Sequence, residues 1–203
     1  DQFNPVTTGV TSLNIAPDAR GGGLGDLGVA TDPDVNSQFW NPAKYAFTES
    51  RGGLAVSYTP WLRKLVNDIN LAYVATLRYF SLGSIQTTDD GGNVLSSVNP
   101  YEMALDLAYS RKLTNNFSMA VALRFIYSDL GYSTDGSSDV KGAAAFAADI
   151  AGYQTFYPIV GRSECQWSWG FNISNIGTKL SYDGGAKSVF LPANLRLGTS
   201  FKF

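Results

Sequence analysis

Four segments of the chain, residues 101–110, 117–127, 167–173 and 195–203, alternate between large apolar side chains and small or polar ones. Thr199 is the one exception at the large positions, and Ile126 is the one large apolar residue at the small positions. A period of two residues is typical of a β-strand whose two faces meet different surroundings. The pattern therefore predicts four strands, each with one apolar face.

Weaker alternation marks four further segments, namely residues 53–59, 69–75, 77–85 and 144–153. Connections rich in Gly, Asp and Ser separate the segments, so the chain predicts about eight strands in an antiparallel meander. The apolar phase changes near Thr76 without a turn signal. We therefore expect a hairpin turn to be missing between Ala75 and Leu77.

Alternation alone leaves two fold classes open, because soluble sandwiches and lipocalin-like barrels also have one apolar face. Three further features favour a membrane. Several segments reach about 10 to 12 residues, near the length of a tilted strand that crosses a bilayer, and aromatic residues stand near the ends of the apolar faces, as in an interfacial girdle. The opposite face combines small residues with charged ones, which are Glu102, Asp106, Arg124, Arg196 and Lys202. The sequence therefore predicts an all-β fold, a transmembrane antiparallel β-barrel, in which Asp106 and Arg124 share the inward face and can pair.

Composition narrows the chemistry that the chain can perform. Among 203 residues, 16% are charged, 13% are aromatic, the net charge is -2, and there is no histidine. Catalytic sites that depend on histidine and histidine-ligated metals are therefore excluded. The lone Cys165 cannot form an internal disulfide, and without a basic excess no nucleic-acid partner is expected. We expect no cofactor, no metal and no catalytic residue. The start at Asp1, without Met or a signal peptide, suggests a processed or partial chain of an exported protein.

The first fifty residues lack strand alternation and are rich in glycine. Gly23, Gly25 and Gly28 have the spacing of a dinucleotide-binding motif, but no apolar strand precedes them and no amphipathic helix follows. The stretch 32–36 begins like a calcium loop, but its later positions lack the glycine and glutamate that such a loop needs. Residues 1–50 are therefore predicted to form an irregular segment distinct from the strands at 51–203.

The N-terminal stretch resembles the plug of FadL-like outer-membrane barrels and, more closely, the PorV family of type IX secretion barrels. The similarity is carried by residues 4–8, 16–30, 38–46 and 57–62, and its plug motif comprises Arg20, Gly23, Gly25, Gly28, Asn41, Pro42 and Ala43. The resemblance implies a plug at residues 1–50 and a barrel at 51–203. It also implies 14 strands, so that the chain, with about eight, would be an incomplete copy.

The resemblance further implies a carrier in the bacterial outer membrane that is not an enzyme. Its partners would be the type IX translocon barrel, cargo proteins with C-terminal signal domains, a surface sortase and outer-membrane lipid or lipopolysaccharide. Connections longer than short periplasmic turns usually face outside, which selects residues 87–99, 131–142, 157–164 and 183–191. Within or beside them, Tyr132, Phe156 and Tyr157 are candidate contacts for cargo or partners. Two other functions stay open: transport of hydrophobic small molecules, as in FadL-like proteins, and deacylation of lipopolysaccharide.

Overall fold

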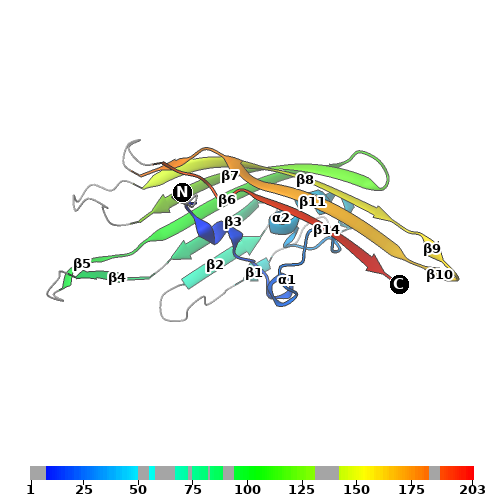
Figure 1. Cartoon of the computed structure of the whole chain (residues 1–203), viewed down its shortest axis with the longest axis horizontal. Helices are drawn as coiled ribbons and strands as arrows, with labels where there is room; N and C mark the ends of the chain where they lie inside the picture. The colour runs from blue at the N-terminus through cyan, green and yellow to red at the C-terminus, as the bar shows by residue number, and fades with distance from the viewer. Residues whose placement is uncertain are drawn as a thin grey trace, which may run out of the picture.

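The computed structural model describes residues 8–49, 55–57, 67–72, 75–81, 83–88, 94–130, 142–182 and 188–203. Eight strands form one antiparallel sheet, in which each strand pairs with its neighbours in chain order. In order they are β1 (Ala55–Ser57), β2 (Asn67–Ala72), β3 (Ala75–Ser81), β6 (Tyr101–Lys112), β7 (Phe117–Asp129), β8 (Ala143–Phe156), β11 (Gln166–Gly177) and β14 (Asn194–Lys202). The sheet is long and curled into a half-barrel (Figure 1), and the prediction of an eight-stranded meander is confirmed.

Three small hairpins lengthen the connections between these strands. They are β4 (Ile85–Thr88) with β5 (Val94–Val98), β9 (Ile159–Val160) with β10 (Ser163–Glu164), and β12 (Leu180–Ser181) with β13 (Ser188–Val189). The sequence predicted loops here because the pairs are short and lie among Gly, Asp and Ser. The expected missing turn between Ala75 and Leu77 is wrong, since β2 ends at Ala72 and pairs with β3, which contains all three residues 75–77.

The two faces of the sheet have the reverse of a soluble protein's polarity. On the outward face Leu107 is 57% and Leu197 is 72% exposed, whereas on the inward face Asp106 and Arg124 are only 1% and 4% exposed. A charged interior beneath an apolar exterior is unfavourable in water but is the arrangement of a transmembrane barrel. The outward face is therefore the surface suited to hydrocarbon.

Aromatic rings border the outward apolar face at both ends. Tyr101 lies between Tyr79 and Tyr127 at one end, with ring centroids 5.9 Å and 6.0 Å away, and Phe117 stacks on Trp169 at the other, at 6.3 Å. On β7 the two borders are ten residues apart, from Phe117 to Tyr127. At about 3.3 Å per residue and a tilt of about 40°, this separation corresponds to roughly 25 Å, the height of the apolar band of an outer-membrane barrel.

The connections fall at two ends of the sheet, because consecutive antiparallel strands reverse direction. The turn at residues 113–116 and the β9–β10 hairpin share one end, which we call the short-turn end. The connections after β3, β7 and β11 share the other, which we call the long-connection end. The β4–β5 and β9–β10 hairpins accordingly project from opposite ends (Figure 1).

This alternation corrects one prediction about the outer loops. Residues 157–164 lie at the opposite end from the other three selected connections, so the four cannot face the same side of a membrane. Phe156 and Tyr157 are thus at the short-turn end. Tyr132 lies outside the described residues. Connection length alone was misleading, because position in the strand order fixes the side.

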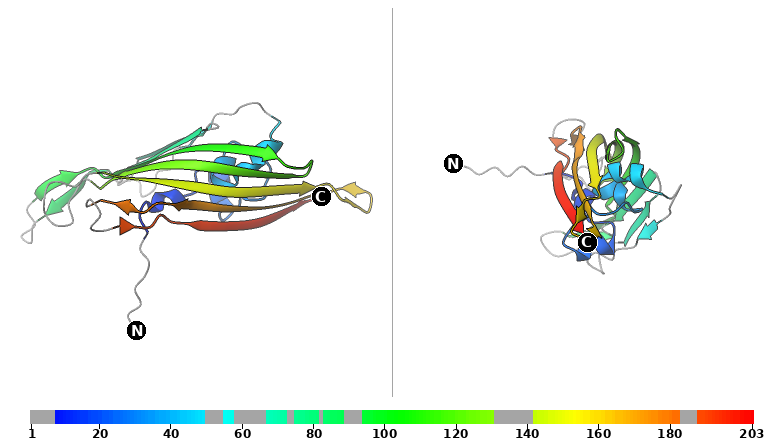
Figure 2. Two further views of the ribbon diagram at one scale, coloured as in Figure 1. Left: turned by 90° about the horizontal axis from the view of Figure 1, so that it is seen from above. Right: turned by 90° about the vertical axis from the view of Figure 1, so that its right-hand side faces the viewer.

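The N-terminal segment occupies the hollow of the sheet (Figure 2). It contains η1 (Thr11–Asn14), α1 (Ala19–Gly23), α2 (Ser37–Trp40) and η2 (Pro42–Phe47), and η2 packs against β6, β7 and β8. The small inward residues of these strands leave room for it. Within the described ranges, none of the helices is long and apolar enough to span a bilayer.

Candidate functional site: a filled lumen with a capped mouth

The Asn-Pro-Ala turn joins the N-terminal segment to the wall. The Asn41 amide Nδ2 donates to the carbonyl oxygens of Val29 and Gly152, both at 2.9 Å, and its Oδ1 accepts from the Ala43 N–H at 3.0 Å. The Ser118 hydroxyl donates to the Ala43 carbonyl at 2.7 Å. Asn41 thus caps η2, with Pro42 at its first position, and binds the wall at the same time.

Two glycines of the N-terminal segment leave room for a tryptophan side chain. A Cβ on Gly21 or on Gly28 would overlap the indole of Trp40, whose Nε1 donates to Asp18 Oδ1 at 2.8 Å. Gly25 has a φ of +77°, which favours glycine. The glycine spacing therefore reflects a buried tryptophan and a turn.

The acidic stretch that resembled a calcium loop forms a hydrogen-bonded turn directly before α2. Asp34 Oδ1 accepts from the Asn36 N–H at 3.1 Å and from the Ser37 hydroxyl at 3.0 Å, at the start of α2. Among the described residues, no group of three or more Asp, Glu, Cys or His side chains is arranged to hold a metal ion. Arg20, in α1, is exposed.

Lys44 is fully buried, and none of the carboxylates in the described part of the chain forms an ion pair with it. Its Nζ donates to the Gly28 carbonyl at 2.8 Å, to the Thr31 hydroxyl at 3.1 Å and to the Asp32 carbonyl at 3.3 Å. Burial lowers the pKa of Lys44 from its ordinary 10.5 to about 8, although the charges of nearby aspartates partly oppose the shift. Lys44 therefore fastens residues 28–32 to η2.

The depressed pKa of Lys44 predicts a gain in stability at alkaline pH. Between pH 8 and 10.5 the unfolded chain holds the proton and the folded chain does not, so the free energy of unfolding rises with pH. We expect a rise of about 2 kcal/mol between pH 8 and 9.5. Burial raises the pKa of Tyr45 to about 12, so its phenol stays neutral in this window.

Urea unfolding in detergent micelles at several pH values measures this effect. The Lys44→Met variant should lose the rise, and the difference between the two pH profiles isolates Lys44 from other groups. Parallel profiles for the two proteins would contradict the assignment.

A buried ionic network crosses the lumen wall from β3 to β11. The Arg124 guanidinium contacts Asp106, Asn175 and Asp149, the last with Nη2 to Oδ2 at 2.9 Å. Arg78 Nη2 contacts Asp106 Oδ2 at 3.2 Å. The sequence placed Asp106 and Arg124 on the same face but left their pairing open, because the register of the strands was not known; the structure shows that they pair. The network links five strands.

The network also reaches the N-terminal segment. Arg78 Nη1 donates to the Leu13 carbonyl at 3.3 Å, and its guanidinium lies 5.6 Å from the Phe39 ring centroid. Arg196 lies over the same ring at 4.7 Å and over Trp40 at 5.7 Å. Cations of the wall therefore hold aromatic rings of the N-terminal segment.

A cavity of about 580 Å³ lies beside the contact between Arg196 and Trp40. Leu27 and Val29 line it from the N-terminal segment, and Arg196 and Leu197 line it from β14. Because these two β14 residues point to opposite faces of the strand, the cavity extends around the free edge of the sheet.

The long-connection mouth is covered by an apolar cap. Val10 and Leu13 of the N-terminal segment are buried against Leu180 and Leu191 of the connection after β11. The wall contributes Ala104, Ile126, Ala143, Ala145 and Ala147. The cap therefore joins three parts of the chain that are far apart in the sequence.

Backbone contacts complete the cap. Thr8 forms a parallel bridge with Phe190, and the Gly9 N–H donates to the Phe190 carbonyl at 2.9 Å. Val10 has a φ of 51° and a ψ of 52°, a left-handed conformation that is rare for a β-branched residue. Such a conformation costs about 1 to 2 kcal/mol, which the burial of the Val10 side chain offsets.

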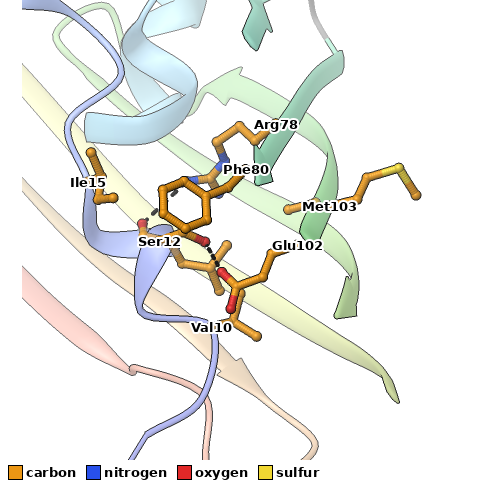
Figure 3. A pocket seen from close by; sticks show the side chains of 9 residues that line it. Val10, Ser12, Ile15, Arg78, Phe80, Glu102 and Met103 are labelled. Carbon is orange, nitrogen blue, oxygen red and sulfur yellow. Dashed lines mark hydrogen bonds between the residues drawn. The ribbon is translucent and has the colours of Figure 1, made fainter. Parts of the chain in front are cut away.

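A cavity of about 20 Å³, large enough for about one water molecule, lies beneath the cap (Figure 3). The Ser12 hydroxyl donates to Glu102 across it, joining η1 to β6. Arg78 also lines it, and Arg78 Nε has no hydrogen-bond partner among the described residues. The cavity therefore brings three polar side chains together within a mainly apolar lining.

A second contact between the N-terminal segment and the wall lies at the short-turn end. The Asp32 carboxylate contacts the Lys202 ammonium of β14 and accepts from Gln166 Nε2 at 3.2 Å. Burial raises the pKa of Asp32, but the hydrogen bond and charge of Lys202 outweigh it, so the pKa lies below its ordinary value. The N-terminal segment is therefore attached near both ends of the lumen.

The family model of the type IX secretion system protein PorV matches residues 1–203. The chain belongs to the PorV family. Comparison with curated proteins gives no match. Membership makes the chain a component of type IX secretion with partners in that system, and it confirms the resemblance inferred from the glycine-rich and Asn-Pro-Ala motifs.

Within this PorV-family chain the structure brings most of the motif residues together. Gly28 packs against Trp40, and Asn41 donates to the wall at Gly152. Pro42 and Ala43 are buried beside them, whereas a Cβ on Gly23 would have no atom within 4 Å. Sequence reasoning missed Lys44 and the Val10 cap. Lys44 follows the Asn-Pro-Ala motif directly, which was its only signal, and the left-handed Val10 had none.

Proposed function

We propose that this PorV-family chain is an outer-membrane carrier and docking subunit without enzymatic activity. It receives cargo with C-terminal signal domains from the type IX translocon barrel and delivers it to the cell-surface sortase. The filled lumen carries the proposal: the N-terminal segment, the ionic network and the cap occupy the interior, so folded cargo cannot enter it and has to bind on the outside. Membership of the PorV family is the reason for assigning the carrier to type IX secretion.

In this proposal the long-connection end faces outside, because short turns are periplasmic in outer-membrane barrels. Cargo then meets the connections at residues 87–99, 131–142 and 183–191, the second of which contains Tyr132. Phe156 and Tyr157 face the periplasm in this orientation and are no longer cargo contacts. The outward face contacts outer-membrane lipid and lipopolysaccharide.

Purification from native membranes tests the carrier proposal. The tagged full-length protein, extracted in mild detergent, should retain secreted proteins that still carry their signal domains, or the sortase, as identified by mass spectrometry. A mock-tagged outer-membrane barrel of similar abundance is the control. Recovery of bound lipid without any cargo or secretion partner would contradict the carrier.

One observation favours a second candidate, transport of hydrophobic small molecules. The cavity of about 580 Å³ places Arg196 beside Leu27 and Val29, a combination that suits an amphiphile with an anionic head. Binding of a fatty acid that Arg196→Met abolishes would favour this candidate. Deacylation of lipopolysaccharide has weaker support: Ser12 contacts Glu102, but the chain has no histidine to serve as a base.

A further inference from the structure

We propose that residues 8–10 occupy a strand slot at the long-connection mouth, and that an extended segment of the cargo's signal domain displaces them when it binds. The inference rests on the proposed carrier function and adds a binding site to it. The slot is the backbone edge at Phe190, the residue that directly follows the β12–β13 hairpin. Three independent observations place it there.

The first observation is that the slot already holds a backbone contact of the kind that an added strand makes. Thr8 pairs with Phe190 in parallel, and the Gly9 N–H donates to the Phe190 carbonyl at 2.9 Å. Adding an extended segment to an exposed hairpin edge is a common mode of peptide recognition, in which backbone hydrogen bonds give affinity. The chain's own segment thus shows the geometry that a guest would use.

The second observation is that the resident segment is strained. Val10, directly after the strand contact, is held at φ 51° and ψ 52°, a conformation that valine avoids. Its burial in the cap keeps it there. A guest strand without this left-handed residue fills the same contacts in a relaxed conformation, so the exchange favours the guest.

The third observation defines the chemistry of the guest. Gly9 of the resident segment lies against Leu180 and Val189. A Cβ added to Gly9 would lie 3.5 Å from each of these side chains, which is an ordinary van der Waals distance. The next residue, Val10, fills an apolar site beside Leu191. The guest is therefore an extended segment with a small residue, Gly or Ala, followed by an aliphatic one.

A reversible disulfide tests whether the resident segment must leave. A Cβ on Gly9 would lie 3.7 Å from Val189 Cβ, within the range of disulfides. We would make Gly9→Cys with Val189→Cys in a Cys165→Ala background, reconstitute the full chain in nanodiscs, and measure binding of a purified signal domain. Each single-cysteine variant under the same oxidation is the control.

We expect the oxidised form to bind the signal domain at least about tenfold more weakly, because the competent state is closed off. Reduction should restore the affinity of the background protein. Equal affinities of the oxidised and reduced forms would overturn the slot while leaving the carrier intact. Absence of binding by the parent protein itself would overturn the carrier and the slot together.

A second pair of variants tests the reverse effect. Gly9→Pro removes the N–H that donates to Phe190, whereas Gly9→Ala keeps it and meets only ordinary contacts. Gly9→Pro therefore weakens the resident segment by one backbone hydrogen bond, and the affinity for the signal domain should rise about two- to tenfold. Gly9→Ala should match the parent, and an equal or weaker affinity for Gly9→Pro would contradict the displacement.

Discussion

Replacing Arg124 by methionine is expected to lower the free energy of unfolding by about 3 to 5 kcal/mol, the largest effect of any single substitution proposed for this chain. The change leaves Asp106 and Asp149 buried on the inward face without the guanidinium that joins them. An uncompensated buried charge is far more costly than a missing contact between neutral groups. Urea unfolding in micelles, followed by tryptophan fluorescence, measures the loss.

The matched control removes a cation from an exposed ion pair. The Lys202 and Asp32 side chains are 47% and 44% exposed, so Lys202→Met should cost no more than about 1 kcal/mol. Similar losses for the two variants would mean that the Arg124 network is hydrated, contrary to its burial. Replacing Arg124 and Asp149 together by apolar residues should recover part of the stability, since Asp106 keeps its contact with Arg78 and Asp149 no longer leaves a buried charge.

Replacing Gly170 by alanine is expected to push the N-terminal segment away from the wall. A Cβ at this position of β11 would lie 2.6 Å from the Val29 carbonyl oxygen and 2.6 Å from Asn41 Nδ2. Backbone cannot yield as a flexible side chain can, so the variant should lose about 1 to 3 kcal/mol and admit protease to residues 28–42. Limited proteolysis in nanodiscs detects the cleavage, and mass spectrometry locates it.

Gly23→Ala is the control for this variant. A Cβ there has open space and the residue lies in α1, so alanine should be neutral or slightly stabilising. If Gly170→Ala and Gly23→Ala resist protease equally, the close packing of the N-terminal segment against β11 is wrong.

The wall of the fold was predictable because it depends on a local pattern. Alternation in residues 101–110 and 117–127 fixed which side chains share a face, and it placed Asp106 and Arg124 together on the inward face, whereas their pairing depends on a register that the sequence does not show. Hydrocarbon on one side and a filled lumen on the other require such a pattern in each spanning strand. The period of two residues is therefore enough to predict which face of each strand points outward and which points into the lumen.

The contents of the lumen were less predictable because they depend on contacts between distant segments. Lys44 binds the backbone of residues 28–32, and Val10 packs on Leu180, contacts that leave no periodic signal. Loop length alone grouped residues 157–164 with the three other long connections, although the strand order places them at the opposite end of the sheet. Counting strand reversals from 113–116 would have separated them. The division between plug and barrel at residue 50 stays a prediction.

Contact between the outward face and lipid chains is the central claim of this account. Quenching of single tryptophans by brominated phospholipids in vesicles tests it most directly. A variant that retains only Trp169, on the outward face, should lose at least about half of its fluorescence, whereas one that retains only the buried Trp40 should be nearly unaffected. Equal, weak quenching of both, from a protein that stays compact and monomeric without any amphiphile, would contradict the account.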